Sequence, residues 1–327
     1  MKACIVTKYG GPDVIAIREV EKPIAKNNEV LIRIEATVAA APDCAFRKGE
    51  PFVSRLFTGL SKPSSIPGDV LAGIVDAVGT DVRQYKTGDR VYGSSGTKFG
   101  TNAEYITLPE DAAIAPMPEN LTFGEAAGIS EGVLTAMPFL RDHGKIRAGH
   151  KVLINGASGG IGVYAVQLAK YFGAEVTGVC GSANMELVKA LGADKVIDYT
   201  KDDFVKACGR YDVIFDTVGK SSFSQCKQAL KPGGIFLSTV PNLPLMMQTA
   251  WTCAFGRQKA VFAATGLRKT QEKRKDLIVL KTMAEEEKIK PVIGRTFWME
   301  QMAQAHRYVE TGHKRGSAVI LVRHSDD

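Results

Sequence analysis

The feature that most constrains this chain is an alternation of short apolar runs, glycine turns and helical segments in its central part. The run 151–154 leads through glycines into a segment whose apolar face carries Ile161, Ala165 and Leu168, and Gly173 ends that segment. Further apolar runs follow, each separated from the next by a helical segment, at 176–180, 196–197, 213–215 and 235–237. This alternation predicts an α/β fold with a doubly wound parallel sheet.

The two ends of the chain have a different pattern. Residues 1 to about 120 form short runs of alternating apolar and polar positions, separated by turn signals such as Lys48-Gly49 and Pro67-Gly68. The last part predicts a strand after Pro291, a helix over 299–310 and a strand over 318–322. We therefore expect a β-rich domain over 1–121 and an α/β domain over 122–265. The segment 266–327 should complete the edge of the second domain and rejoin the first.

Composition excludes several classes of protein. The chain has 327 residues, of which 45% are hydrophobic and 24% charged, as in ordinary globular proteins with room for two cores. Its longest apolar stretch, 243–255, is shorter than the roughly 20 residues that cross a bilayer. The basic residues are dispersed despite a net charge of +7. We expect no nucleic acid or membrane partner and, without a signal-peptide pattern, a cytoplasmic location.

The cysteines give no sign of a disulfide framework. They are far apart, without a C-x-x-C pair, in a chain large enough to fold without cross-links. We expect reduced thiols, several of them buried, at Cys4, Cys44, Cys180, Cys208, Cys226 and Cys253.

A glycine-rich segment, 155–162, lies between a predicted strand and a predicted helix. Gly159 would let the backbone approach a pyrophosphate, and Gly162 would let the helix pack close to the strand. The helix N-terminus would add free N–H donors and the positive end of its dipole. The segment departs from the G-x-G-x-x-G fingerprint at its first glycine, where Ala157 stands.

The same letters also fit the G-x-S-x-G nucleophile elbow of α/β-hydrolases, centred on Ser158. A serine hydrolase would need an acid and then a histidine downstream, and Asp216 with His306 or His313 could serve. This alternative leaves Gly162 unexplained and offers no HGGG-like oxyanion segment. A third interpretation, a short-chain dehydrogenase, requires Tyr-x-x-x-Lys, but no tyrosine after the loop has a lysine four positions on.

The whole chain resembles the medium-chain dehydrogenase/reductase superfamily, in its zinc-free quinone oxidoreductase-like branch. The matching pieces occur in the family's order over essentially the full length. They include Gly10-Gly11-Pro12, Pro67-Gly68-Asp69, Gly88-Asp89-Arg90-Val91, Leu134-Thr135-Ala136, the glycine segment and Leu191-Gly192-Ala193-Asp194.

This resemblance implies a GroES-like catalytic domain built from both chain ends, a Rossmann domain between them, and a homodimer. It also implies transfer of hydride from NADPH to a small electrophilic molecule, such as a quinone, an enone or enal, or a similar activated carbonyl compound. A family member that binds the nucleotide with little catalytic activity is the alternative.

The metal site of the related alcohol dehydrogenases is missing. Their Gly-His-Glu segment reads Gly68-Asp69-Val70 here, no cysteine occurs between Cys44 and Cys180, and the five histidines form no ligand-spaced cluster. We expect a zinc-independent enzyme, for which a "zinc-binding dehydrogenase" label would describe ancestry. Without a Lewis acid, electron-poor acceptors are the natural substrates.

Asp43 is the one candidate for a catalytic polar group, in 40–43, where the branch usually reads Asn-Pro-x-Asp. Its structural alternative is an acid that caps a turn after Pro42. The segment 243–255 would line a substrate pocket, or form a buried helix or a dimer contact. The residues expected to bind the cofactor are Thr135, Ser158, Gly159, Gly160, Ile161, Gly162, Cys180, Gly181, Ser182, Asn184, Tyr199, Thr217, Val218 and Val240.

The end of the second Rossmann strand predicts which cofactor binds. NAD-selective sites carry an acid about 20 residues beyond the glycines, but 179–184 contains none; Glu175 precedes the strand and Glu186 falls in the next helix. Tyr199 matches a tyrosine that reaches the 2′-phosphate in NADPH-dependent relatives. Neutral donors would hold most of that phosphate, so we expect a preference for NADPH of about 1–3 kcal/mol. Cationic help could come from Lys189, Lys201 or Arg323.

Overall fold

The computed structural model describes residues 1–63, 66–206 and 210–324, and the chain divides into two compact units. Unit 1 comprises Met1–Glu131 and Gly266–Asp327, and unit 2 comprises Gly132–Thr265. The first boundary lies inside helix α3 (Phe123–Pro138) and not at residue 121, because one continuous helix carries the chain from one unit into the next.

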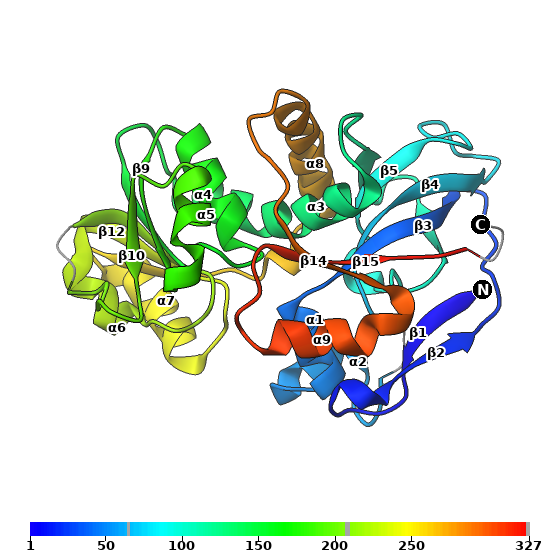
Figure 1. Ribbon diagram of the computed structural model, residues 1–327, viewed down its shortest axis with the longest axis horizontal. Coiled ribbons are helices and arrows are strands. Elements are labelled where there is room, and N and C mark those ends of the chain that lie inside the picture. Colours follow the sequence, from blue (N-terminus) through cyan, green and yellow to red (C-terminus); the bar gives the residue numbers. More distant parts are fainter. Residues whose placement is uncertain (64–65, 207–209, 325–327) are drawn as a thin grey trace. The chain divides into compact units, whose positions relative to one another are not determined.

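Unit 2 is built on a six-stranded sheet in which every neighbouring pair is parallel, in the order β10-β9-β8-β11-β12-β13. Figure 1 labels β9, β10 and β12 of this sheet. Its strands are β8 (Lys151–Asn155), β9 (Glu175–Cys180), β10 (Lys195–Asp198), β11 (Tyr211–Asp216), β12 (Leu230–Ser238) and β13 (Lys259–Phe262). The helices of this unit after α3 are α4 (Gly162–Tyr171), α5 (Met185–Ala190), α6 (Phe223–Cys226) and α7 (Leu243–Phe255). This topology confirms the predicted doubly wound sheet. The strand order reverses between β8 and β11, the place where such sheets bind ligands beyond the carboxyl ends of their strands.

The parallel sheet explains why its strands read as continuous apolar runs. Val152, Leu153 and Ile154 of β8 are fully buried, as expected for a strand that is covered on both faces. Helix α4 differs from its predicted single apolar face, since it is buried on all sides from Gly162 to Ala169. Even Gln167 is buried, and its side-chain amide donates to the Val163 carbonyl.

Unit 1 contains a seven-stranded sheet with strands from both ends of the chain. Six strands follow the order β14-β15-β3-β4-β5-β7, β6 pairs with β3, and β1 and β2 form a separate ribbon. The strands are β1 (Lys2–Val6), β2 (Ile15–Glu19), β3 (Glu29–Ala39), β4 (Val70–Val78), β5 (Arg90–Ser94), β6 (Tyr105–Pro109), β7 (Ala113–Pro116), β14 (Ile293–Trp298) and β15 (Ser317–Leu321). Because β15 pairs antiparallel with β3, the last strand of the chain completes the sheet that an early strand begins.

The helices of unit 1 correct two expectations. Besides the first part of α3, the α-helices of this unit among the described residues are α1 (Ala41–Lys48), α2 (Arg55–Thr58), α8 (Thr270–Glu285) and α9 (Met302–Glu310). Helix α8 packs against β7, so the segment after residue 265 belongs to unit 1 and does not complete the edge of the parallel sheet. Helix α1, unforeseen in a β-rich domain, begins with Pro42 in its first turn and ends at Gly49, whose φ of 67° suits glycine.

Two further expectations concern thiols and membranes. Cys4, Cys44, Cys180 and Cys226 are free and buried, Cys253 is free and exposed, and Cys208 lies outside the described residues. Over the described ranges, no helix has both the length and the apolar character needed to span a bilayer.

Candidate active site

The glycine turn after β8 has the tight geometry that its sequence predicted. Gly156 has a φ of 81°, and a Cβ atom there would lie 2.5 Å from a Val218 side-chain carbon. A Cβ on Gly162 would lie 2.0 Å from the Gly156 carbonyl oxygen. Both positions therefore require glycine, and the start of α4 can approach the turn only because Gly162 lacks a side chain.

The turn leaves backbone donors free. Among the described residues, the N–H groups of Ser158, Gly160 and Ile161 have no acceptor, and they precede the first residue of a ten-residue helix. A Cβ on Gly159 would meet only the Gly156 oxygen, at 3.4 Å. Free N–H groups at a helix N-terminus beside open space fit a diphosphate, so these residues suit the dinucleotide that the fold implies.

Asp216, the last residue of β11, organises the loop that faces the turn. Its fully buried carboxylate accepts from the Asn155 side chain, from the N–H groups of Val218 and Gly219 at 3.1 and 3.0 Å, and from Ser221. This network fixes the backbone after β11. The sequence pointed to Asp216 only as a possible hydrolase acid and gave no sign of this role.

Three residues expected to bind the cofactor, Thr217, Val218 and Val240, lie at the same edge of the sheet. Thr217 donates its hydroxyl to the Asn155 carbonyl at 2.8 Å. Val218 and Val240 are 41% and 39% exposed, and a Cβ on Gly219, between β11 and β12, would lie 2.8 Å from Val240. These two valines thus offer an apolar surface beyond the ends of β11 and β12.

Helix α3 brings Thr135 towards the glycine turn. A Cβ on Gly132 would lie 2.5 Å from the Gly160 carbonyl oxygen and 2.1 Å from the Tyr164 ring. The helix therefore packs directly on the turn at Gly132, and half-buried Thr135 follows one helical turn later.

At the end of β9, Cys180 is buried, and Gly181, Ser182 and Asn184 form the following turn. The Tyr199 hydroxyl lies 3.4 Å from where a Cβ on Gly181 would be. The structure thus brings these predicted residues together. It adds a residue that the sequence did not indicate, Asp198, which accepts a hydrogen bond from Ser182.

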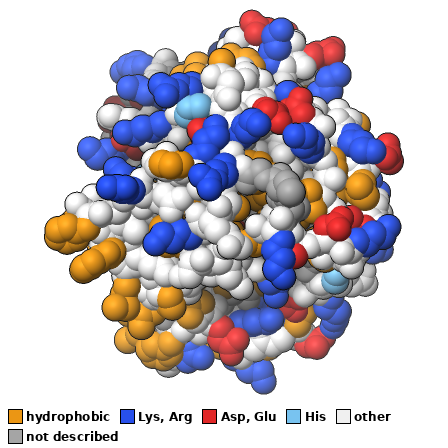
Figure 2. Space-filling model, turned by 90° about the vertical axis from the view of Figure 1, so that its left-hand side faces the viewer, with side chains coloured by type: hydrophobic (Ala, Val, Ile, Leu, Met, Phe, Trp, Pro, Cys, Tyr) orange, Lys and Arg blue, Asp and Glu red, His pale blue; other side chains and the backbone are white. Residues whose placement is uncertain are grey.

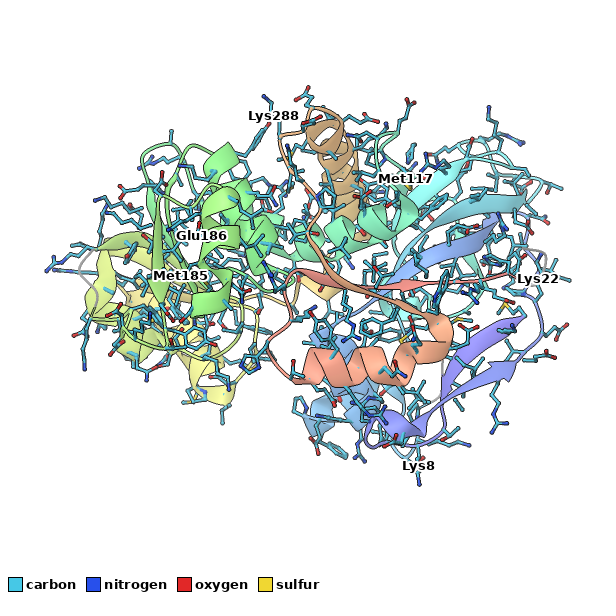
Figure 3. All side chains as sticks on the ribbon, viewed as in Figure 1. Lys8, Lys22, Met117, Met185, Glu186 and Lys288 are labelled. Carbon is cyan, nitrogen blue, oxygen red and sulfur yellow. The ribbon has the colours of Figure 1, made fainter. Side chains whose placement is uncertain are left out.

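The charged groups considered around this position have other partners. Glu186, labelled in Figure 3, lies in α5 and pairs with Lys189 at 3.1 Å. Glu175 is the first residue of β9, not a residue before it, and pairs with Lys195 at 3.2 Å. The Arg323 guanidinium lies over the Trp298 ring, 4.0 Å from its centre, in unit 1.

The residues named for a hydrolase also have other partners. The Asp216 carboxylate is used by its own loop, as described above. In unit 1, His306 Nδ1 lies 3.4 Å from the Cys44 sulfur and accepts from Arg47 Nε at 3.2 Å. Burial and the neighbouring Arg47 lower the pKa of His306 to about 4. His313 is exposed.

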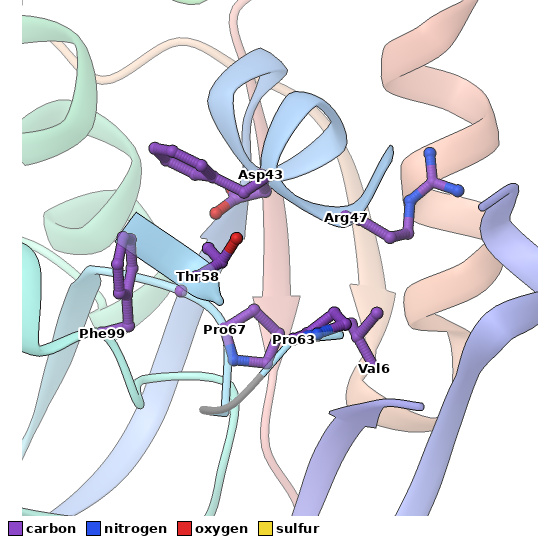
Figure 4. Close-up of a pocket in the computed structure, with 9 residues that line it drawn as sticks. Val6, Asp43, Arg47, Thr58, Pro63, Pro67 and Phe99 are labelled. Atoms are coloured by element: carbon purple, nitrogen blue, oxygen red, sulfur yellow. The ribbon is translucent and has the colours of Figure 1, made fainter. Parts of the chain in front are cut away.

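Unit 1 contains a pocket with mostly apolar walls and one carboxyl group (Figure 4). The guanidinium of Arg47 donates its hydrogen bonds to the Gly10 carbonyl, to His306 and to Glu310, and not to a group inside the pocket. Asp43 is therefore the acidic group of the lining, which comprises Val6, Asp43, Phe46, Arg47, Thr58, Pro63, Pro67, Gly68 and Phe99.

Asp43 is held at the start of α1. Its Oδ2 accepts the Ala40 N–H at 2.8 Å, so it caps this helix. Burial raises the pKa of Asp43 to about 7, with further contributions from the nearby carboxylates of Asp69 and Glu131, while the Ala40 bond and Lys314 oppose the rise. Asp43 is 7% exposed, and with this pKa its protonated and ionised forms are both populated near neutral pH.

The residues at the alcohol dehydrogenase metal position do not fit zinc. Asp69 accepts from the Ser94 hydroxyl at 3.3 Å, and burial raises its pKa against the opposing charge of Lys273. In the part of the chain that the structure describes, no three His, Cys, Asp or Glu side chains are grouped to hold a metal.

Comparison with known proteins places the chain in a family. A family model described as alcohol dehydrogenase GroES-like domain matches residues 26–119, and one described as zinc-binding dehydrogenase matches 191–320. The chain is 33% identical to 2-methylene-furan-3-one reductase of Solanum lycopersicum, over 98% of this chain and 79% of the relative. It is 32% identical to the chloroplastic NADPH-dependent alkenal/one oxidoreductase of Arabidopsis thaliana, over the same shares of 98% and 79%.

A solved structure gives the same result. The quinone oxidoreductase from Coxiella burnetii superposes with a TM-score of 0.88 at 30% identity, covering 99% of each chain. Together with the fold and the glycine turn, these similarities show that the chain belongs to the medium-chain dehydrogenase/reductase superfamily, in its quinone oxidoreductase-like branch.

Proposed function

We propose that the protein is an NADPH-dependent reductase of enones, enals or quinones that works without zinc. The observation that carries this proposal is the pocket of unit 1, whose described lining residues combine apolar side chains with Asp43 and include no histidine or cysteine. Such a pocket suits a small apolar molecule but offers no Lewis acid to activate a simple ketone. Conjugated acceptors need less activation, because conjugation already lowers the barrier to hydride attack.

The cofactor would be held by unit 2. The free N–H groups of Ser158, Gly160 and Ile161 would bind its diphosphate, and Val218 and Val240 would contact the nicotinamide end. When bound, NADPH supplies the hydride. The choice of NADPH rests on the absence of an acid in 181–184 and on Tyr199 beside Gly181, and a relative that is 32% identical is named as NADPH-dependent.

Asp43 is the proposed proton donor. An enone or enal that gains a hydride at its β-carbon becomes an enolate, and one proton at the α-carbon gives the saturated product; a proton on the oxygen gives the enol, which then tautomerises to the same product. A protonated Asp43 gives that proton, becomes a carboxylate, and regains a proton from water. A carboxyl with a pKa of about 7 suits this task, since it is partly protonated at neutral pH.

The test is an assay of NADPH oxidation with purified protein across enals, enones and quinones. We expect turnover with at least one conjugated acceptor, little turnover with saturated ketones, and the same rate after treatment with EDTA. Loss of activity on metal removal would contradict the zinc-independent site. Cofactor binding without turnover on any acceptor would favour the alternative, a nucleotide-binding member with little catalytic activity.

The proposal includes a homodimer formed through unit 2. Among the described strands, β13 is the edge of the parallel sheet, and α7 packs beside it. Helix α7 is not buried, because it exposes apolar side chains. Figure 2 shows hydrophobic side chains gathered at the lower left of the face in view. The exposed residues of α7 are Leu243, Met246, Met247, Trp251 and Phe255. A second copy would cover them and the free strand edge.

Sedimentation equilibrium should therefore give twice the chain mass of 35.2 kDa. Trp251 is 68% exposed in the single chain, so Trp251→Glu should shift the protein towards the monomer without unfolding it. Thr270→Glu, at the start of α8 in unit 1, is the control and should remain dimeric. A monomeric wild-type protein at micromolar concentration would contradict the homodimer.

A further inference from the structure

Asp198 is an acid that the sequence spacing did not place at the cofactor site. It is the last residue of β10, and the parallel pairing of β10 with β9 sets it opposite Cys180. Its carboxylate is 5% exposed and accepts a hydrogen bond from the hydroxyl of Ser182, two residues beyond the end of β9. The segment 181–184 contains no acid, but the strand order brings one to its side.

The carboxylate of Asp198 is firmly held in its charged form. Oδ1 accepts the Thr200 N–H at 3.0 Å and the Thr200 hydroxyl at 2.7 Å, and the Lys201 ammonium lies 3.8 Å from Oδ2. The bond from Ser182 and those from Thr200 lower the pKa of Asp198 to about 2. Asp198 therefore carries a full negative charge at neutral pH.

This charge determines how Ser182 can act. An ionised carboxylate has no proton to donate, so Ser182 must give its only hydroxyl proton to Asp198. The Thr200 hydroxyl, 3.3 Å from Ser182 Oγ, also donates to Asp198. On its exposed side, Ser182 then offers only lone pairs. A phosphate oxygen is likewise an acceptor, so the two would repel one another.

The position of Ser182 after β9 is where its hydrogen bonding would affect the cofactor. In Rossmann sheets, the end of the second strand lies beside the adenosine ribose, where a 2′-hydroxyl or a 2′-phosphate is distinguished. In unit 2 that strand is β9, and Gly181 and Ser182 follow it directly.

We propose that Asp198 weakens the binding of a 2′-phosphorylated dinucleotide, both through its own charge and by directing the Ser182 proton away from the phosphate position. Asp198 thereby sets how strongly the protein distinguishes NADPH from NADH. The inference rests on the proposed binding of a nicotinamide dinucleotide by unit 2. It corrects the picture of a strand end with neutral donors only.

The variant Asp198→Asn tests this directly. The asparagine oxygen can still accept from Thr200, while its amide nitrogen donates to Ser182 Oγ and frees the serine proton for a phosphate. We expect the Kd for NADPH to fall by about 10-fold, the effect of gaining a hydrogen bond to a charged group and losing a repulsion. The Kd for NADH should change by less than about 2-fold, because NADH has no 2′-phosphate. Both values come from fluorescence titrations of purified protein at one ionic strength.

Two controls separate the causes. Asp202→Asn removes the same charge from an exposed neighbour that makes no side-chain bond to Ser182, and should leave both Kd values almost unchanged. In the Ser182→Ala background, Asp198→Asn should give a smaller gain for NADPH. An equal gain in both backgrounds would overturn the role of the Ser182 hydroxyl.

The outcomes also separate this inference from the proposed function. If the wild-type chain binds both dinucleotides and Asp198→Asn leaves their ratio unchanged, only the inference about Asp198 is wrong. If the wild-type chain binds neither dinucleotide, the proposed function is wrong, and the inference about Asp198, which rests on it, is wrong as well. A tighter NADPH complex with unchanged NADH binding supports both.

Discussion

Replacing Gly159 by leucine is expected to weaken NADPH binding by at least about 100-fold, or roughly 2.7 kcal/mol, while leaving the protein folded. A Cβ at this position meets only the Gly156 oxygen at 3.4 Å, so the folded chain can accept a side chain there. The leucine would instead fill the open space beside the free N–H groups of Gly160 and Ile161, where the diphosphate is proposed to bind. Fluorescence titration gives the affinity, and thermal unfolding confirms that the fold is retained.

Two other glycines serve as controls for this experiment. Gly11→Leu places the same side chain in open space in unit 1 and should change neither cofactor binding nor folding by much. Gly162→Ala should destabilise unit 2 by about 2–4 kcal/mol, because its Cβ would collide with the Gly156 carbonyl. Normal NADPH binding by Gly159→Leu would show that the dinucleotide does not use this turn. Loss of an esterase activity in Ser158→Ala would instead support the hydrolase interpretation.

Replacing Asp43 by asparagine is expected to lower kcat by about 100-fold or more, the usual contribution of a positioned proton donor. Asparagine has nearly the same shape, and its oxygen can still accept the Ala40 N–H that caps α1, so the helix should form normally. Binding of NADPH to unit 2 should be unaffected. Steady-state kinetics on the best conjugated acceptor measure this, and an unchanged kcat would show that the proton comes directly from solvent.

The pH profile distinguishes proton donation from a structural role. Because the active form of Asp43 is protonated, kcat should fall as pH rises through its pKa of about 7. The carboxylate of Asp69 helps to raise that pKa, so Asp69→Asn should move the falling limb to lower pH. The fall in kcat at high pH would belong to another group if its pH did not change in Asp69→Asn, or if the fall were still present in Asp43→Asn.

The same carboxyl should leave a signature in stability. Its pKa is about 7 in the folded chain and about 3.9 when unfolded. Between these values the folded state holds a proton that the unfolded state has released, so stability falls as pH rises from 4 to 7. The full difference corresponds to at most roughly 4 kcal/mol. Asp43→Asn carries no charge, so it should gain stability relative to the wild type between pH 5 and pH 8, as thermal unfolding can measure.

The sequence predicted the features that depend on local periodicity and on glycine. Apolar runs such as 152–154 indicated strands buried on both faces, and the following helix was visible from its spacing. Gly162 could be assigned its packing role from its place between a strand and a helix, because the space available there is set by a few neighbouring residues. The order of motifs along the chain indicated the family, which the comparisons confirm.

Two helices could not be read from local sequence patterns. Helix α1 was missed, since its residues 41–48 are too few to show a helical period. For 243–255 the sequence left a pocket wall, a buried helix and a dimer contact open, because a buried apolar helix and one that is covered by a partner have the same composition; the structure shows the apolar side chains of α7 exposed.

The electrostatics of both candidate sites were decided by tertiary structure. Asp43 owes its raised pKa to burial and to Asp69 and Glu131, which are remote from it in the chain. Asp198 meets Ser182 only because β10 pairs with β9 in a register that sets Asp198 opposite Cys180. Periodicity specifies which residues form strands, but the order and register of the strands determine which charges meet at their carboxyl ends. The sequence therefore determined the sheet and the glycine turn. Only the tertiary structure determined the raised pKa of Asp43 and the contact between the Asp198 carboxylate and Ser182.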